Sequence, residues 1–590
     1  MWRKVLSIGL MMLALAACQP TTPTPALITN TPEIKPSPTI TAQKPASPGS
    51  NASVDYRAYW QADNLLVSQN PFPGAPLPLE RGTLFAGAGA CAACHANMRD
   101  QAGQDVSITN MWRSTLLANA ARDPYWRATV RSEVNQAPQI ADIIQKKCAT
   151  CHMPMAEVTL VQQGQAIGLV EQGLFDLANP LNALGNDGVS CTLCHQIEPD
   201  NLGQPESFSG GFLIDTQLAQ GQRLSYGPYR PGKNLVNVMQ NGSGFIPVQG
   251  VHLAQAETCG NCHDLYTPYL DAAGEVAGEF AEQLIYSEWA NSAYAASQSC
   301  QDCHMPVVQG GVQLSITGGP MRQPFSQHIF VGGNAYMARL LQQNGEELQV
   351  AANPDQFLAT IDRTIQQIST QTARLILSGT RVENGQLTAE ILIENLAGHK
   401  FPAGFPSRRA WLHIRVLDSS GQLVFESGGV EASGAISGND NDADPARFEP
   451  HYQTLSLPDQ VQIYEGIMAD SDGNVTTTLL RGATYIKDNR LLPAGFQANP
   501  QIPVISPAGE AAADSDFVGG SDRVLLHLDA SGWQGPFTLE VSLLYQTVAY
   551  RWAQNLILEQ GAEVSQFAGY YAATPNLPLI AASAQASITP

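Results

Sequence analysis

The stretch Cys91-Ala92-Ala93-Cys94-His95 is the first of five copies of one motif in this 590-residue chain. Each copy sets two cysteines three positions apart and places a histidine directly after the second. In chain order, the first to fifth motifs are Cys91–His95, Cys148–His152, Cys191–His195, Cys259–His263 and Cys300–His304. This pattern is the attachment signal of haem c, so the chain is predicted to fold around haem.

The spacing in the motif has a chemical reason. Two thiols add to the two vinyl groups of one porphyrin, and the next imidazole reaches the iron as its proximal ligand. Five motifs therefore predict five covalently attached haems c. The predicted attachment residues are Cys91, Cys94, Cys148, Cys151, Cys191, Cys194, Cys259, Cys262, Cys300 and Cys303, and the predicted proximal ligands are His95, His152, His195, His263 and His304.

Three other uses of paired cysteines compete with haem. A disulfide framework gives no reason for a histidine after every second cysteine. Zinc sites combine two half-sites, and five half-sites do not pair. Thioredoxin-like redox pairs occur once in a domain rather than five times along a chain. Haem accounts for all ten motif cysteines and leaves only Cys18 outside the motifs.

The sixth ligand of each haem decides between an electron carrier and a catalyst. Six histidines lie outside the motifs, and only His252 and His328 fall in the motif-bearing half. These two, with His399 from a loop between predicted strands, are the candidate distal ligands; a polar surface role is the alternative for each. Met98 and Met111 follow the first motif and could also serve, with core packing as their alternative.

The N-terminus is typical of an export signal. A basic start precedes the short apolar run Val5–Leu15, which ends in a bacterial lipobox at Cys18. We expect a lipoprotein signal peptide over residues 1–18, diacylation of Cys18, and a Pro/Thr-rich tether over residues 19–54. An ordinary signal peptide with a chance cysteine is the alternative. The chain is thus expected to be extracytoplasmic and lipid-anchored to a membrane or the cell surface.

The rest of the chain is predicted to be multidomain α+β. Residues 55–350 are expected to form a loop-rich, mainly helical pentahaem cytochrome domain, and residues 351–377 a connecting helix. Alternating apolar and polar residues with turn signals predict a β-sandwich-like domain over residues 378–582. A frayed tail is expected over residues 583–590.

Individual elements are also predicted. Asn384-Gly385 and Ser420-Gly421 fit hairpin turns. The predicted helices are residues 111–134, 280–297, 335–341 and 354–377, and the predicted strands are residues 387–393, 411–416, 423–426, 524–528 and 537–541.

The charge balance limits the kinds of partner that the chain is expected to bind. The chain has 31 basic and 52 acidic residues, a net charge of −21, which argues against nucleic acid and against docking on an anionic membrane surface. It allows a basic redox partner, with solubility alone as the alternative. Arg408 and Arg409 could pair with haem propionates or form a solvated pair. The acidic run 439–444 resembles a calcium loop, with a plain acidic turn as the alternative.

The sequence resembles bacterial multihaem cytochromes related to cytochrome c-554 and the hydroxylamine oxidoreductase superfamily, over residues 87–340. The resemblance implies that the C-terminal part is an appended β-domain and that His328 and His399 supply distal ligands. Besides the five motifs it rests on residues 112–114, 121–124, 282–289, 303–306 and 398–402.

The chain also departs from the enzymes of that superfamily. It has no Cys-x-x-Cys-Lys site, which the pentahaem nitrite reductases use, and fewer motifs than the octahaem enzymes. The resemblance therefore favours electron transfer with redox partner proteins and assembly with other cytochromes. An oxidoreductase acting on a small nitrogen or sulfur oxyanion at an open haem is the alternative. An adhesive surface protein that uses haem only for stability is a third interpretation.

Overall fold

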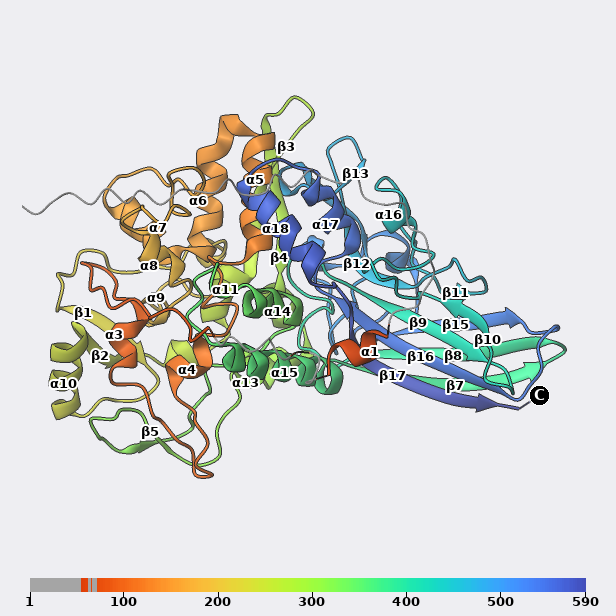
Figure 1. Cartoon of the computed structure of the whole chain (residues 1–590), viewed down its shortest axis with the longest axis horizontal. Coiled ribbons are helices and arrows are strands. Elements are labelled where there is room, and N and C mark those ends of the chain that lie inside the picture. Colours follow the sequence, from red (N-terminus) through yellow and green to blue (C-terminus); the bar gives the residue numbers. More distant parts are fainter. Residues whose placement is uncertain (1–54, 62–64, 66–71, 590) are drawn as a thin grey trace, which may run out of the picture. The chain divides into compact units, whose positions relative to one another are not determined.

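The computed structural model describes residues 55–61, 65 and 72–589 (Figure 1). The predicted signal peptide, Cys18 and the whole predicted tether lie outside the described residues. Within the described part, no helix is long and apolar enough to cross a membrane.

The motif-bearing half consists of short helices joined by loops, with three small two-stranded sheets. Its helices are α1 (Tyr56–Tyr59), α3 (Ala88–Ala92), α4 (Ile108–Trp112), α5 (Pro124–Gln136), α6 (Ala141–His152), α7 (Pro154–Gln162), α8 (Asn182–Asn186), α9 (Cys191–Cys194), α10 (Lys233–Ser243), α11 (Glu257–His263), α12 (Ile285–Ala290), α13 (Cys300–His304) and α14 (Ala335–Gln343). Its strand pairs are β1 (Arg223–Gly227) with β2 (Phe245–Gln249), β3 (Asp264–Leu270) with β4 (Val276–Leu284), and β5 (Val312–Gln313) with β6 (Met321–Arg322).

Two helices predicted in this half are shorter than expected. The prediction over residues 111–134 is divided between α4 and α5. Helix α5 begins at Pro124, where the Asp123 side chain accepts hydrogen bonds from the next backbone N–H groups. Proline at the first helical position and aspartate as N-cap favour a new helix start. In the prediction over residues 280–297, the first residues belong to β4, and only α12 and a following 3₁₀ turn are helical.

Helix α15 (Pro354–Gln371) links the two halves. Its N-terminus has a capping box between Asn353 and Gln356, and it buries one face through Phe357, Ile361 and Ile368. This spacing places the three side chains on one side of a helix. The helix ends before the predicted residue 377, because strand pairing begins at Ala373.

The C-terminal half contains two sheets. One has the strand order β11-β15-β8-β7; the other has β13-β12-β9-β16-β17, with β10 paired to β9 and β14 paired to β12. The strands are β7 (Ala373–Glu383), β8 (Gln386–Asn395), β9 (Arg409–Leu417), β10 (Leu423–Ser427), β11 (Thr454–Leu455), β12 (Ile463–Ala469), β13 (Val475–Thr476), β14 (Thr484–Asp488), β15 (Ser521–Asp529), β16 (Phe537–Gln546) and β17 (Leu579–Ile588).

All five predicted strands are present as β8, β9, β10, β15 and β16. The predicted hairpin at Asn384-Gly385 is confirmed, since both residues have the positive φ (51° and 77°) that a two-residue type I′ turn requires. The expected frayed tail is wrong as far as Ile588. Strand β17 pairs with β16 through the backbone, which its small Ala and Ser side chains did not indicate.

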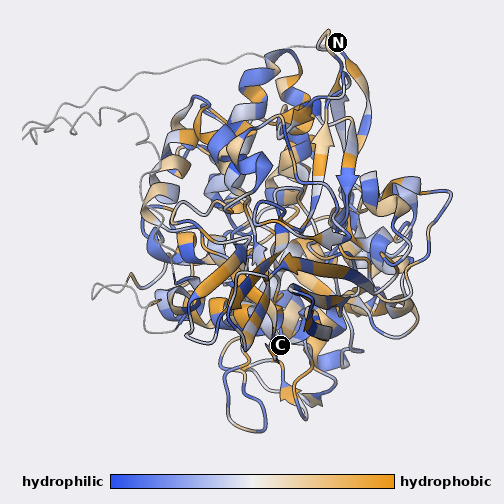
Figure 2. Cartoon of the chain, turned by 90° about the vertical axis from the view of Figure 1, so that its right-hand side faces the viewer, coloured by the Kyte–Doolittle hydropathy of each residue, from blue (hydrophilic) through white to orange (hydrophobic). Residues whose placement is uncertain are grey.

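The two halves share one hydrophobic core. Buried residues of both sheets belong to the same cluster as Tyr125 on α5, Phe280 on β4 and Tyr336 on α14. Two further helices, α17 (Tyr550–Ile557) and α18 (Ala562–Ala573), also contribute, and α18 packs on α5. Figure 2 shows helices and strands that each carry both apolar and polar residues, as elements packed on a core from one side do.

Candidate haem-binding site

One cavity of about 1400 Å³ runs through the motif-bearing half. This exceeds the roughly 300–1,000 Å³ of ordinary ligand pockets. All ten motif cysteines and all five motif histidines line it. The sheet-rich half closes part of its wall with His399, Leu480 and Tyr545. The structure therefore brings together motifs that are spread over more than 200 residues of sequence.

Each motif lies on a helical turn. Helices α6, α9, α11 and α13 contain the cysteines of the second to fifth motifs. In the first motif, the His95 backbone N–H donates to the Cys91 carbonyl at 3.0 Å and continues the turn of α3. Residues three and four apart lie on one helix face, so the two thiols and the imidazole of a motif point the same way.

The motif histidines are held in one tautomer. Their Nδ1–H groups donate to backbone carbonyls in four of the five motifs: His95 to Leu314 (2.7 Å), His152 to Ala120 (2.9 Å), His195 to Tyr226 (2.5 Å) and His304 to Val331 (2.5 Å). A carbonyl only accepts, so Nδ1 carries the proton and Nε2 keeps a free lone pair. Metal-bound histidines are oriented in this way in proteins.

Burial also favours the neutral form of three motif imidazoles. It lowers the pKa of His152 and of His263 to about 4, and it lowers the pKa of His195 below its ordinary value. A neutral imidazole is the form that binds a metal. In addition, the Trp126 ring stacks on His152 at 4.3 Å between centroids and fixes that ring's orientation.

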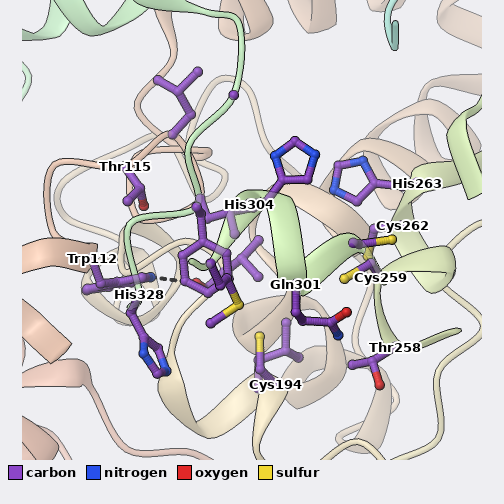
Figure 3. A pocket seen from close by; sticks show the side chains of 18 of the residues that line it. Trp112, Thr115, Cys194, Thr258, Cys259, Cys262, His263, Gln301, His304 and His328 are labelled. Carbon is purple, nitrogen blue, oxygen red and sulfur yellow. Dashed lines mark hydrogen bonds between the residues drawn. The ribbon is translucent and has the colours of Figure 1, made fainter. Parts of the chain in front are cut away.

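The thiols show which motifs are neighbours. Thiols of different motifs lie within hydrogen-bonding reach in three pairs, Cys91 with Cys191, Cys151 with Cys262, and Cys259 with Cys300. Cys194 of the third motif also interacts with both thiols of the fourth. The fourth motif is thus next to the second, third and fifth, and the third is next to the first. Figure 3 shows Cys194, Cys259 and Cys262 around one part of the cavity.

His399 lies beside the histidine of the fifth motif. Its ring and that of His304 are nearly parallel, at 11°, with centroids 6.3 Å apart. With about 2 Å from metal to nitrogen and about 1 Å more to each centroid, two imidazoles on opposite sides of one metal have centroids about 6 Å apart. His399 donates its Nδ1–H to the Lys400 carbonyl at 2.9 Å, which leaves Nε2 free.

The other two predicted distal ligands differ in their surroundings. His328 lines the cavity near His195 and His95, with Nδ1 buried and without a hydrogen-bond partner. Burial lowers its pKa to about 3. His252 is buried near His195 but is not among the residues that line the cavity, and its Nε2 faces the Ile197 carbonyl at 2.9 Å. His328 is therefore the better placed of the two.

Of the two methionines and two arginines predicted as possible haem contacts, only Arg408 lines the cavity. Met98 and Met111 pack with other apolar residues and are not among the residues that line the cavity. Arg408 lines the cavity near His263 and His399. Arg409 does not, because its guanidinium binds both carboxylate oxygens of Asp442 at 2.8 and 2.9 Å.

The acidic run that resembled a calcium loop forms α16 (Asp440–Ala443). The Asp442 carboxylate binds Arg409 and the Ile436 backbone N–H, and Asp440 pairs with Arg447. These contacts already occupy the carboxylates and favour the plain acidic turn.

A second cluster, of His451, Asp514 and Asp522, has the residue types of a metal site. The side-chain amides of Gln462 and Asn489 both donate to His451 Nδ1, at 2.9 and 3.1 Å. His451 Nε2 must then carry the proton, which it donates to Asp514. The cluster is therefore a hydrogen-bonded network and not a set of free ligands.

Sequence reasoning missed the charged residues beside the second motif. Glu133, Lys147 and Glu282 line the cavity there and interact electrostatically with Cys148 or with one another. Burial raises the pKa of Glu133 to about 7 and of Glu282 to about 8. The sequence did contain one indication of Glu133. It lies seven residues after Trp126, and this spacing places both side chains on the same face of a helix.

These observations fit haem c. The cavity has paired thiols on one helix face, neutral imidazoles with a free Nε2, and apolar walls, which are the donors and surroundings that the group requires.

The chain was also compared with known proteins. No protein-family model matches it, and no curated protein matches it. Among solved structures, a penta-heme cytochrome c552 from Thermochromatium tepidum is similar, with a TM-score of 0.46 and 15% sequence identity. The similarity covers 87% of this chain and 100% of that one.

Proposed function

We propose that this chain is an electron-transfer protein that holds five haems c in its cavity. The observation that carries the proposal is that the ten cysteines and five histidines of the motifs line one cavity, with thiols of neighbouring motifs within hydrogen-bonding reach of each other. Haem c supplies one-electron redox chemistry when bound. The order in which the motifs neighbour one another suits a relay, because each motif lies beside at least one other.

The chain's own residues would tune that chemistry. The cysteines attach each group, and the carbonyls that accept from Nδ1 orient the proximal imidazoles. His399 and His328 would supply sixth ligands at the fifth motif and near the first and third motifs. Arg408 would pair with a propionate.

A spectrum tests the proposal. The chain, expressed in a bacterial host with haem-attachment machinery, should show reduced absorption bands typical of haem c and should pass electrons to and from small redox mediators. Replacement of both cysteines of one motif by alanine should remove one haem and leave the others. A protein that exports and folds without haem would contradict the proposal.

We propose in addition that Cys18 carries a lipid anchor on the extracytoplasmic side, where the protein meets redox partner proteins or other cytochromes. The lipobox ending at Cys18 supports this. Wild-type protein should incorporate labelled palmitate and sediment with membranes, and Cys18→Ser should do neither. Equal membrane association of both proteins would rule the anchor out.

A second candidate function is an oxidoreductase that acts on a small nitrogen or sulfur oxyanion. It is favoured by the second motif, where Glu133, Lys147 and Glu282 line the cavity. Among the described residues, the histidines that line the cavity outside the motifs are His328 and His399. Both lie by other motifs, so neither is placed to be the sixth ligand at the second motif.

Electron paramagnetic resonance of the ferric protein separates the two functions. Five low-spin signals support the carrier. A high-spin signal that nitrite or sulfite shifts supports the enzyme, since an open sixth position would then bind the anion.

A further inference from the structure

Two segments of the chain lack acidic residues. Residues 216–256 and 303–345 contain no aspartate or glutamate, although the whole chain has 52 acidic residues among 590. The same segments include Arg230, Lys233 and Arg322. In a protein with a net charge of −21, such stretches are electrostatically distinct.

The two segments meet in space beside the first motif. Tyr229 donates to the Pro324 carbonyl, and the Arg322 guanidinium donates to the Arg230 carbonyl at 3.1 Å and lies over the Tyr229 ring. A side-chain atom at Gly319 would touch Leu235 of α10. Phe245 of β2, which follows α10, packs on Ala90 in the turn of the first motif.

Helix α10 and a loop of the second segment form part of the cavity wall. Helix α10 has no buried residue, yet its apolar side chains Leu235, Val238 and Met239 line the cavity. The loop opposite, residues 314–324, also lines the cavity through most of its length. Helix α10 and this loop therefore both contribute to the cavity wall near the first motif.

The outer side of this wall is apolar with a basic edge. Ile316 is 54% exposed and Met321 57%, and neither lines the cavity. Arg230 and Lys233 are also exposed, and Arg322 follows Met321 in β6. Acidic groups are present near β1, where Glu198 and Asp215 interact with Arg223 and Tyr226. We call Arg230, Lys233, Ile316, Met321 and Arg322 the α10 surface.

We propose that the α10 surface is the docking site of an acidic electron-transfer protein. Transient redox complexes use a small apolar contact whose charged rim steers the partner. Here the exposed apolar residues lie beside the first motif, where the Ile316 backbone N–H donates to the Cys94 carbonyl at 3.0 Å, and the rim is basic within an acidic molecule. A basic partner would instead be steered to the rest of the surface.

The inference rests on the proposed function, because docking at this surface serves the group held by the first motif. Figure 1 places α10, β1 and β2 at the left edge and β7 at the lower right, so the surface and the C-terminal sheets can be altered separately. Arg374 and Arg381 on β7 are 59% and 57% exposed, and they provide a matched control for charge.

The test uses the haem-loaded protein with flavodoxin, a small acidic electron-transfer protein. In stopped flow, flavodoxin hydroquinone gives up one electron and becomes the semiquinone while one ferric haem becomes ferrous. The variant Arg230→Glu/Lys233→Glu should lower the second-order rate at least tenfold at low ionic strength. The control Arg374→Glu/Arg381→Glu, with the same change of net charge, should lower it less than twofold.

A binding measurement accompanies the kinetics. Oxidised flavodoxin should bind the immobilised wild type and the control equally and the α10 variant more weakly. The difference should vanish in about 1 M salt, where charges are screened beyond roughly 3 Å. Equal rates and binding for both variants would overturn the docking site.

The absorption spectrum keeps the two proposals distinguishable. If the wild type carries no haem, the proposed function fails. If haem is present and the α10 variant behaves as the control does, only the docking site fails.

Discussion

At the scale of single residues, His399 is the most informative side chain of the site. It comes from the sheet-rich half, and its ring centroid lies 6.3 Å from that of His304, about the separation expected for two ligands of one metal. We predict that His399→Ala leaves the fifth haem five-coordinate, so that a high-spin signal appears in the electron paramagnetic resonance spectrum. His399→Met should restore a low-spin haem at higher potential.

The control for this prediction is His527→Ala. His527 is exposed on β15 and is not among the residues that line the cavity. Its variant should keep the wild-type spectrum. If His399→Ala also keeps that spectrum while remaining folded, His399 is not a ligand.

The raised pKa of Glu282 leads us to predict that the free energy of unfolding depends on pH. Burial, with the nearby Glu133 carboxyl, raises its pKa to about 8 in the folded protein. Above its ordinary pKa the unfolded chain releases this proton while the folded protein still holds it, so the free energy of unfolding falls as pH rises toward 8. A difference of one between the folded and unfolded pKa values corresponds to about 1.4 kcal/mol.

Glu282→Gln should remove this contribution. Denaturant unfolding at pH 5.5 and pH 8 should show a smaller loss of stability in the variant than in the wild type. An equal loss in the two proteins would mean that Glu282 titrates near its ordinary value.

At the scale of elements, a buried ionic network joins α12 to the loop of His399 and the end of β14. Lys400 binds Asp488 at 2.6 Å with both side chains fully buried, and Arg490 bridges Asp488 and Glu288. The Lys400 backbone N–H also donates to Glu288. The network thus fixes the residue next to His399 against the motif-bearing half.

Removal of one member should leave an uncompensated buried charge. We predict that Lys400→Met lowers the free energy of unfolding by about 3–5 kcal/mol. The exposed pair of Arg374 with Glu394 provides the comparison, and Arg374→Met should cost less than about 1 kcal/mol. Similar costs for the two variants, measured by denaturant unfolding, would contradict this role of the network.

Sequence patterns predicted elements best where one local signal was sufficient. Alternation found β8 and β15, and Asn384-Gly385 found the hairpin turn that precedes β8. The patterns failed where tertiary pairing decides the structure. Strand β17 has small residues and depends on its pairing with β16, and the apolar run that begins at Phe280 divides into a strand and a helix.

At the scale of the whole molecule, the motifs predicted which residues would form the site but not how they lie in space. The spacing within each motif indicates that the two cysteines and the histidine bind the same haem. It contains nothing that places Cys151 next to Cys262, or His399 next to His304 across the two halves. Those contacts come from the shared core, which is a property of the entire folded chain.

The number of haems attached to each chain shows whether the five motifs bind haem c. Intact-mass spectrometry with a pyridine haemochrome assay should give five covalently bound haems per chain. Alanine replacement of both cysteines in a single motif should lower the count to four. A wild-type protein with no covalently bound haem, or a count that does not follow the number of intact motifs, would show that the motifs do not attach haem.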